Sequence, residues 1–254
     1  MMNTQKDRTV IVTGAAQGIG YAIAESFINN GDFVAILDLN LEAAQGAAKK
    51  LGNAKGYKVD VTNEEMVKST IEQIIADRGT IDVLVNNAGL QHIAKVEEFP
   101  LDKWNLLIGV MLTGPFLMSK HVIPTMKKQH KGRIINISSA HGRIPDAYKS
   151  AYVSAKFGVI GFTKTAALET AQDGITVNAI MPGPVRTELI EKQLPKLAAE
   201  DGTTEQEALN HHILGKQWMK RLLEPSEIGA TAVFLASDGA AAITGEGIGV
   251  TGGM

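Results

Sequence analysis

The stretch TVIVTGAAQGIG, from Thr9 to Gly20, decides the fold of this chain. Its first five residues are all β-branched, which predicts a buried strand. Glycines follow at 14, 18 and 20, and a helical pattern then runs to Asn30. Glycines at a strand-to-helix turn let the backbone turn tightly, bring bare amides to a pyrophosphate and pack the helix closely on the sheet. The stretch predicts a dinucleotide-binding turn, although a glycine triad on its own also fits a plain loop.

The rest of the chain repeats this alternation of short apolar strands and helices. We expect strands at 9–13, 33–37, 55–59, 82–86, 133–138 and 175–181, a short last strand at 247–251, and helices at 19–30, 41–51, 63–77, 102–128 and 152–172. Such alternation is typical of parallel βαβ units with right-handed crossovers. The predicted fold class is α/β, a doubly wound parallel sheet of the Rossmann type with helices on both faces. A single domain over residues 1–254 is sufficient for this length.

Composition argues against several classes of function. The formal net charge is −2 and the 25 basic residues form no long cationic run, so nucleic-acid binding is not expected. The absence of cysteine removes disulfides, thiol catalysis and cysteine-ligated metal, which fits a reducing compartment. The polar start of the chain leaves no room for a signal peptide, and no apolar run approaches the ~18 residues of a membrane span. We therefore expect a soluble cytoplasmic protein.

A tyrosine and a lysine four residues apart supply candidate chemistry. Tyr152 and Lys156 share one face of a predicted helix. An ammonium beside a phenol lowers the phenol's pKa from ~10, which makes Tyr152 a candidate general acid and base. Ser139, after the strand predicted at 133–138, can place its hydroxyl against that phenol. Taken alone, a Tyr and Lys at this spacing also occur by chance on surface helices.

Asp38 ends the second predicted strand, where an acidic side chain can accept hydrogen bonds from an adenosine ribose. A 2′-phosphate would meet a like charge there, and neither the glycine turn nor Leu39 supplies a cation. We therefore expect NAD rather than NADP. The alternative role for Asp38 is to cap the next helix, which Asn40 could do equally well.

Together these residues resemble the short-chain dehydrogenase/reductase family. The resemblance rests on TGAAQGIG at 13–20, Asn86-Asn-Ala-Gly89, Ser139, Tyr152-x-x-x-Lys156 and Pro182-Gly183, which come in the family's order over nearly the whole chain. It implies NAD-dependent hydride transfer with Ser139, Tyr152 and Lys156 as catalytic residues, in a homotetramer. It also implies these cofactor contacts: Gly14, Gln17, Gly18, Ile19, Gly20, Asp38, Asp60, Val61, Asn87, Ala88, Gly89, Tyr152, Lys156, Pro182, Gly183, Val185 and Thr187. Without the resemblance, Asp60 and the 86–89 segment fit ordinary turns.

Five further segments resemble the bacterial D-3-hydroxybutyrate dehydrogenase branch of that family: NAGLQH at 87–92, SSAHG at 138–142, KSAY at 149–152, RTELIEKQ at 186–193 and KRLLEP at 220–225. The substrate contacts implied by this branch are Gln91, His141, Lys149 and Gln193 at the carboxylate, and Ser139 and Tyr152 at the reacting oxygen. A small anionic keto acid needs donors at its far end, which these side chains supply. Separately, each of the four also fits an ordinary loop, cap or surface position.

Residues 188–220 carry charge and helical periodicity directly after the sixth strand. We interpret them as a lid over the crevice, with a plain surface insertion as the alternative. His211 and His212 lie in this segment, and we place them on its solvated face because no carboxylate or third histidine stands at ligand spacing. No metal site is expected.

Two positions depart from the family pattern. Met111 stands where many relatives have an asparagine that supports a water-linked proton route, and a thioether cannot replace that amide. The chain ends in VTGGM rather than in the Asp-Gly-Gly-Trp tail of the hydroxybutyrate branch, which puts the wall of the substrate site in question. Trp218 could fill apolar space there or pack within the lid.

The preferred function is therefore NAD-dependent dehydrogenation of (R)-3-hydroxybutyrate to acetoacetate, or the reverse. Two alternatives stay open. One is an NAD-dependent dehydrogenase of another small alcohol or ketone, such as a sugar alcohol or an acetoin-like compound. The other is an NADH-binding sensor without turnover.

Overall fold

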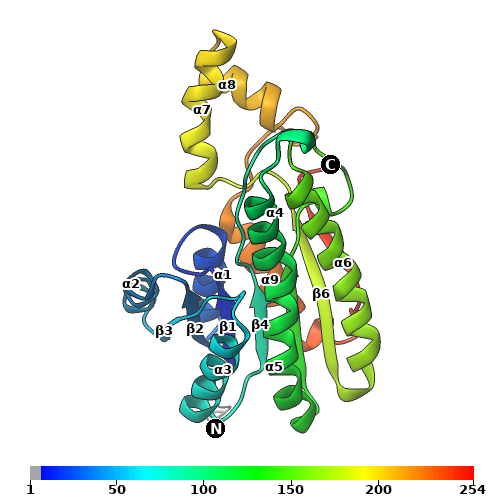
Figure 1. Ribbon diagram of the computed structural model, residues 1–254. Coiled ribbons are helices and arrows are strands. Elements are labelled where there is room, and N and C mark those ends of the chain that lie inside the picture. The colour runs from blue at the N-terminus through cyan, green and yellow to red at the C-terminus, as the bar shows by residue number, and fades with distance from the viewer. Residues whose placement is uncertain (1–6) are drawn as a thin grey trace.

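The computed structural model describes residues 7–254, and its centre is a seven-stranded parallel sheet (Figure 1). The strands lie in the order β3-β2-β1-β4-β5-β6-β7. Their bounds are β1 Thr9–Thr13, β2 Phe33–Asp38, β3 Ala54–Lys58, β4 Val83–Asn86, β5 Gly132–Ile137, β6 Ile175–Pro182 and β7 Gly247–Val250. The predicted doubly wound sheet is confirmed, and each strand begins and ends within one residue of its predicted bounds. The polar start of the chain, on which the expectation of no signal peptide rests, lies largely outside the described residues.

Helices cover both faces of the sheet. One face carries α1 (Gly18–Asn29), α2 (Leu41–Leu51) and α9 (Pro225–Leu235). The other face carries α3 (Glu64–Arg78), α5 (Gly114–Lys128) and α6 (Ser150–Thr170). The helix predicted for 102–128 is in fact α4 (Leu101–Ile108) and α5, with a π-helical turn over Gly109–Thr113 between them.

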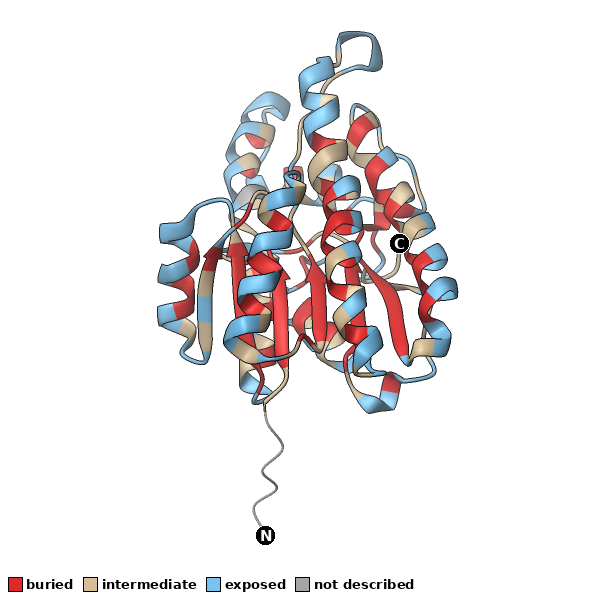
Figure 2. Ribbon diagram, turned by 60° about the horizontal axis from the view of Figure 1, so that its bottom comes forward, coloured by how far each residue is buried: buried red, intermediate tan, exposed pale blue. Residues whose placement is uncertain are grey.

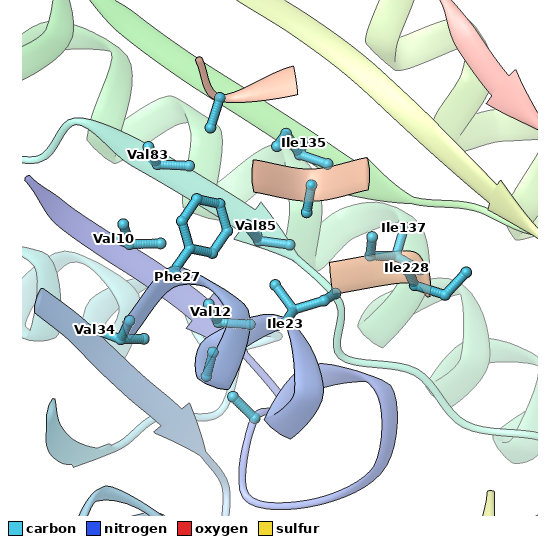
Figure 3. Close-up of a cluster of buried hydrophobic side chains, with 14 of the residues drawn as sticks. Val10, Val12, Ile23, Phe27, Val34, Val83, Val85, Ile135, Ile137 and Ile228 are labelled. Atoms are coloured by element: carbon cyan, nitrogen blue, oxygen red, sulfur yellow. The ribbon is translucent and has the colours of Figure 1, made fainter. Parts of the chain in front are cut away.

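Each face of the sheet buries its own apolar cluster, because strands covered on both sides are apolar on both sides. In β1, Val10 and Val12 belong to the cluster under α1 and α9, whereas Ile11 belongs to the cluster under α3 and α5. Figure 3 shows Phe27 of α1 among Val10, Val12 and Val83, all without solvent exposure. Full burial of such a side chain contributes roughly 1.5–3 kcal/mol. In Figure 2 the sheet is accordingly the buried centre, and the exposed residues lie on the outer sides of the helices.

The helical stretch Leu101–Lys128 is long and apolar enough to cross a membrane by length and composition, so the prediction that no such run exists is wrong. In the fold this stretch packs on the sheet. Met118, Val122 and Met126 of α5 are fully buried in the cluster shared with α3 and β4. It is a core helix of the sheet domain, and its apolar character follows from that burial.

The strand order changes direction between β1 and β4. The carboxyl ends of these two strands bound a crevice. β1 runs into the glycine turn, β4 into Asn87, β5 into Ser138 and Ser139, and β6 into Gly183. Parallel strands bring these four segments to the same edge of the sheet. The fold therefore gathers the predicted site residues before any side-chain contact is considered.

The segment predicted as a lid forms α7 (Glu188–Asp201) and α8 (Glu205–Ala208), followed by a π-helical turn over Leu209–Ile213. In Figure 1 these helices stand above the carboxyl ends of the strands and away from the sheet. The two helices pack against each other. They thus project over the crevice edge as one unit.

The end of the chain fastens the segment that follows this unit. The backbone amides of Trp218 and Met219 donate to the carbonyl oxygens of Gly253 and Gly252, at 2.9 Å each. The buried side chain of Gln217 adds a hydrogen bond to the carbonyl oxygen of Thr251, at 3.0 Å. The last residues are thus tied to the base of the predicted lid.

Candidate active site

The glycine turn between β1 and α1 is packed so closely that side chains have no room. Gly14 has φ +61°, and a Cβ there would lie 2.9 Å from Cα of Ala88. A Cβ on Gly20 would lie 2.4 Å from the carbonyl oxygen of Gly14 and 2.5 Å from Nδ2 of Asn87. Glycine is therefore needed at 14 for conformation and space, and at 20 for space alone.

The first amides of α1 have no side-chain cap. Gln17 is the N-cap residue, and its side chain makes no hydrogen bond to them. Gln17 and Gly18 are exposed and Ile19 is half-buried, so this helix start faces the crevice edge without a partner of its own. Uncapped amides at the positive end of a helix dipole favour an anion. The turn can therefore hold a pyrophosphate.

A hydrogen-bonded bracket joins the glycine turn to the segment after β4. Nδ2 of Asn87 donates to the carbonyl oxygens of Thr13, at 3.0 Å, and of Gly14, at 3.1 Å. In return, Oγ1 of Thr13 accepts from the amides of Asn87, at 3.0 Å, and of Ala88, at 3.1 Å. The bracket fixes the distance between the two segments. Thr13 was not predicted as a site residue, although its place at the end of β1 was the available signal.

Asp38 holds the adjacent turn through backbone hydrogen bonds. Its Oδ2 accepts from the amide of Ala16, at 3.3 Å, and its Oδ1 from the amide of Asn40, at 3.1 Å. The cap of α2 is Asn40, whose Oδ1 accepts from the amide of Ala43 at 3.1 Å. The alternative that Asp38 caps α2 is therefore wrong, and its carboxylate stands beside the uncapped start of α1.

Lys58 brings a cation to the same place. It is the register partner of Asp38 in the ladder between β2 and β3, and both residues line a surface hollow together with Leu39. The expectation that no cation would meet a 2′-phosphate took account only of neighbours along the chain and so missed this lysine. Lys58 is thus a cation in this hollow, which the carboxylates of Asp38 and Glu42 also line.

Asp60 and Val61 follow β3 on the rim of the crevice. Oδ1 of Asp60 accepts from the amide of Thr62, at 2.9 Å, and from its hydroxyl, at 2.7 Å. This carboxylate therefore orders its own turn, as expected of an ordinary turn. Val61 packs against α5 so closely that a Cβ on Gly114 would lie 2.9 Å from its Cγ2.

The segment after β6 forms the opposite rim, beginning at Pro182. The amide of Gly183 donates to the carbonyl oxygen of Val250, at 2.9 Å, and a Cβ on Gly183 would lie 2.6 Å from the carbonyl oxygen of Thr251. Val185 forms a parallel bridge with Leu223. Thr187 is the N-cap of α7, and its side chain makes no capping hydrogen bond.

Ser139, Tyr152 and Lys156 meet at the carboxyl end of β5. The Tyr152 phenol is hydrogen-bonded to the side chain of Ser139, whose Oγ also accepts from the amide of His141 at 3.1 Å. Nζ of Lys156 lies 5.5 Å from the centroid of the Tyr152 ring. The structure thus brings together the three side chains that were predicted to act together.

Burial controls the protonation of this cluster. Burial raises the pKa of the Tyr152 phenol, and the hydrogen bond with Ser139 offsets this only in part. Burial also lowers the pKa of Lys156 to about 8. Nζ of Lys156 donates to the carbonyl oxygen of Ile137, at 2.8 Å. The prediction that Lys156 acidifies Tyr152 is therefore wrong for this arrangement, because Ser139 is the group that favours the phenolate.

Met111 lies in the π-helical turn between α4 and α5 and is buried. It belongs to a small apolar cluster against which Tyr152 packs, and its Sδ would lie 3.7 Å from a Cβ placed on Gly89. The amide that many relatives carry here is thus replaced by an apolar contact between the Tyr152 helix and the Gly89 segment. No side-chain proton route passes through this position.

Two of the predicted carboxylate ligands lie beside Tyr152. The His141 and Tyr152 rings meet edge to face, with centroids 6.4 Å apart. Lys149 immediately precedes α6, one turn from Tyr152. Gln91 lies in the loop after β4, and that loop joins the Lys149 loop through a hydrogen bond from the amide of Ala94 to the carbonyl oxygen of Tyr148 at 3.0 Å.

Asp146, which was not predicted as a site residue, is close to both Lys149 and His141. Its Oδ2 lies 2.7 Å from Nζ of Lys149 and 3.4 Å from Nε2 of His141. Burial raises the pKa of Asp146, but the hydrogen bond and charge of Lys149, with smaller effects of His141 and Lys216, hold it below its ordinary value. Burial lowers the pKa of His141. Near neutral pH the cluster therefore holds a carboxylate and an uncharged imidazole. An aspartate three residues before Lys149 was the available signal.

Gln193 does not reach this cluster. It lies on α7, and within residues 7–254 no hydrogen bond or ion pair joins it to His141 or Lys149. The predicted set of four carboxylate ligands is thus incomplete with α7 in this position.

The predicted lid contains a contact that was not expected from the sequence. Oδ2 of Asp201 lies 2.6 Å from Nε2 of His212 and 3.6 Å from Nδ1 of His211. The three possible ligand atoms lie within 4.8 Å of one another. The prediction that no carboxylate lies at ligand distance from the two histidines is therefore wrong, because the fold brings Asp201 to them. The contact ties the end of α7 to the turn after α8, and all three residues are exposed.

Comparison with known proteins agrees with this architecture. A family model described as short chain dehydrogenase matches residues 8–198. The chain is 48% identical over 252 residues to an uncharacterized oxidoreductase, YxjF, of Bacillus subtilis (strain 168), covering 98% of each chain. It is 40% identical over 253 residues to a D-beta-hydroxybutyrate dehydrogenase of Rhizobium meliloti (strain 1021), covering 97% of this chain and 98% of the relative. It is also 40% identical over 248 residues to the 3-oxoacyl-(acyl-carrier-protein) reductase FabG of Vibrio harveyi, covering 97% of each.

Proposed function

Because this chain belongs to the short-chain dehydrogenase/reductase family, we propose that it transfers a hydride between NAD and a small 3-hydroxy acid, with (R)-3-hydroxybutyrate and acetoacetate as the pair. The observation that carries this proposal is the cluster of Ser139 and Tyr152 beside the cationic side chain of Lys149. A carbonyl oxygen at the two hydroxyls and a carboxylate at the lysine describe a short keto acid. The likeness to a D-beta-hydroxybutyrate dehydrogenase supports the same choice.

In the reduction, Tyr152 donates its proton to the carbonyl oxygen, and Ser139 donates a second hydrogen bond as negative charge develops. Donors placed in advance at such an oxygen are worth about 2.7–4 kcal/mol each. Because burial raises the pKa of Tyr152, the phenol keeps its proton near neutral pH and is ready to act as the acid. Bound NADH supplies the hydride. Met111 offers no proton route, so Tyr152 regains its proton through backbone groups and solvent.

The cofactor is held by the glycine turn and by Asp38. The uncapped amides at Gln17 and Gly18 suit a pyrophosphate, and Asp38 suits a ribose diol. Lys58 offers the nearest opposing argument because it would favour a 2′-phosphate. We assign NAD because the Asp38 carboxylate lies beside the start of α1, where it accepts a hydrogen bond from the amide of Ala16. Lys58 belongs to the neighbouring strand β3.

The remaining assignments are proposed from the resemblance to the family. Residues 1–254 act as one domain, and residues 188–220 close as a lid that carries Gln193 to the substrate. The assembly is a homotetramer in the cytoplasm. Support for association comes from exposed apolar side chains on the outer sides of α5 and α6, namely Phe116, Phe157 and Leu168.

Two other functions are distinguishable. A dehydrogenase of neutral alcohols or ketones would use the same hydroxyls without Lys149. A sensor without turnover, which the loss of the asparagine at Met111 suggests, would bind NADH and reduce nothing.

The deciding experiment is NADH oxidation with acetoacetate, acetoin, butanone and a 3-oxoacyl thioester. We expect acetoacetate to be reduced fastest, and Lys149→Ala to lower its kcat/KM by roughly 10–100-fold, the loss that follows removal of a charged hydrogen bond. Lys164→Ala, which removes an exposed lysine from α6, the helix that Lys149 precedes, is the matched control. An equal loss of kcat/KM for butanone would contradict the proposed carboxylate clamp. NADH binding without reduction of any ketone would favour the sensor.

A further inference from the structure

The place at Lys149 that a substrate carboxylate needs is already taken by a carboxylate of the protein. Oδ2 of Asp146 accepts the Lys149 ammonium at 2.7 Å and lies 3.4 Å from His141. Asp146 belongs to the loop before α6, and its side chain is only 30% exposed. These are the same donor atoms through which the proposed function holds its substrate.

We propose that Asp146 is a specificity-determining residue, an internal carboxylate that occupies the Lys149 ammonium beside His141 in the free site and competes there with the carboxylate of the substrate. The inference rests on the proposed function for the identity of the substrate, but not for the competition itself. A short acid binds only by displacing Asp146 or by sharing its donors, so Asp146 weakens the binding of every small monocarboxylate.

The surrounding charges support competition over simple tethering. Lys149 is the cation in contact with Asp146, whereas the charge of Lys216 has the smallest effect on the pKa of Asp146 and of His141. With Asp146 in place, one internal carboxylate already balances the Lys149 ammonium, and a substrate carboxylate adds a second negative charge. Without Asp146, the Lys149 ammonium would face the substrate alone. The attraction for an anion is then larger, because a partly buried charge is poorly screened.

The geometry of Lys149 points the same way. An ammonium has three donors, so Asp146 and a substrate can share it only if both carboxylates approach closely, which their like charges oppose. Asp146 therefore has to turn away when the acid binds. Its neighbour Tyr148 has φ +65°, and this loop is linked to the Gln91 loop through Ala94. Because the backbone is held at Tyr148, we expect the Asp146 side chain to be the part that moves.

The test is Asp146→Asn, which keeps the shape and removes the charge. Binding of acetate to the NADH-loaded enzyme is followed by NADH fluorescence at constant ionic strength, alongside steady-state reduction of acetoacetate and butanone. We expect acetate to bind about tenfold more tightly to the variant, and the ratio of kcat/KM for acetoacetate over butanone to rise by a similar factor. Asp146→Glu restores the charge and should return both values toward wild type.

The matched control is Asp173→Asn. Asp173 pairs with Lys127 at 2.8 Å, and its side chain is also 30% exposed, but the pair lies at the far end of α6. It should change neither acetate binding nor the ratio. Asp146→Ser provides a second uncharged variant if Asn disturbs the loop.

Acetate binding that is unchanged or weaker in both uncharged variants overturns the inference and makes Asp146 a tether for Lys149. Tighter acetate binding with no reduction of acetoacetate by any variant supports the inference while the proposed substrate fails. If Asp146→Asn reduces acetoacetate with an unchanged ratio of kcat/KM for acetoacetate over butanone, the proposed substrate is supported and the proposed role of Asp146 is contradicted.

Discussion

Replacing Lys156 by methionine should stabilise the protein near neutral pH. Lys156 is 4% exposed, and its Nζ has one partner, the carbonyl oxygen of Ile137 at 2.8 Å. No carboxylate pairs with it among the described residues, and burial alone lowers its pKa from 10.5 to about 8. Methionine fills similar space with a flexible apolar chain and has no charge to bury.

The size of the effect comes from the pKa difference. One pKa unit corresponds to about 1.4 kcal/mol, so the charged lysine lowers the free energy of unfolding by roughly 3 kcal/mol at pH 7. Loss of the hydrogen bond to Ile137 offsets about 1 kcal/mol of this. Between the folded pKa near 8 and the ordinary value of 10.5, the unfolded chain binds more protons, so the stability of the wild type rises with pH. The variant should be more stable by about 2 kcal/mol at pH 7 and nearly equal to wild type at pH 9.5.

The assay is urea unfolding of the cofactor-free protein at both pH values, followed by circular dichroism. Protein concentration is held fixed, because association would add to the apparent stability. Lys164→Met is the control, since Lys164 is exposed on the same helix and its loss should change stability by less than ~0.5 kcal/mol at either pH. A Lys156→Met protein that is less stable than wild type at pH 7, or a gap that does not narrow by pH 9.5, would refute the reasoning and indicate an anionic partner for Lys156.

Two further substitutions address the chemistry and the cofactor. Tyr152→Phe should lower kcat for acetoacetate reduction at least a hundredfold while the Kd for NADH stays within about threefold, because the phenol acts on the reacting oxygen; a normal kcat would end the proposed role. Asp38→Asn should lower the preference for NADH over NADPH by roughly tenfold, because it removes the charge that repels a 2′-phosphate and leaves Lys58 beside it; a preference that does not move in competition kinetics would place the ribose elsewhere.

Local sequence was enough to predict the sheet and its crevice. β1 and β6 are nearly continuous apolar runs, and such runs between turns leave few alternatives to a buried parallel strand. The turn at Gly14 and Gly20 was also predictable from its place between a strand and a helix, although part of the close packing around these glycines comes from Asn87 and Ala88, far along the chain. Short-range pattern was therefore sufficient for the strands and for the nucleotide turn.

Contacts made across the fold were not predictable. Lys58 reaches Asp38 through sheet register, and Asp201 reaches His212 through the packing of α7 and α8. The protonation of Lys156 is set by burial, which the i,i+4 spacing with Tyr152 does not reveal. The sequence spacing correctly predicted that Tyr152 and Lys156 lie close together. Only the fold shows which groups their side chains hydrogen-bond.

The attachment at the chain end has a practical consequence. Gly252 and Gly253 have φ +68° and +83°, and a Cβ on them would lie 2.7 Å from Nε2 of Gln217 and 2.8 Å from the Trp218 ring. These two glycines let the last residues lie flat against the segment that connects the helices above the crevice to the rest of the domain. Alanine at either position would therefore push these residues off that connection and leave the helices above the crevice less firmly held.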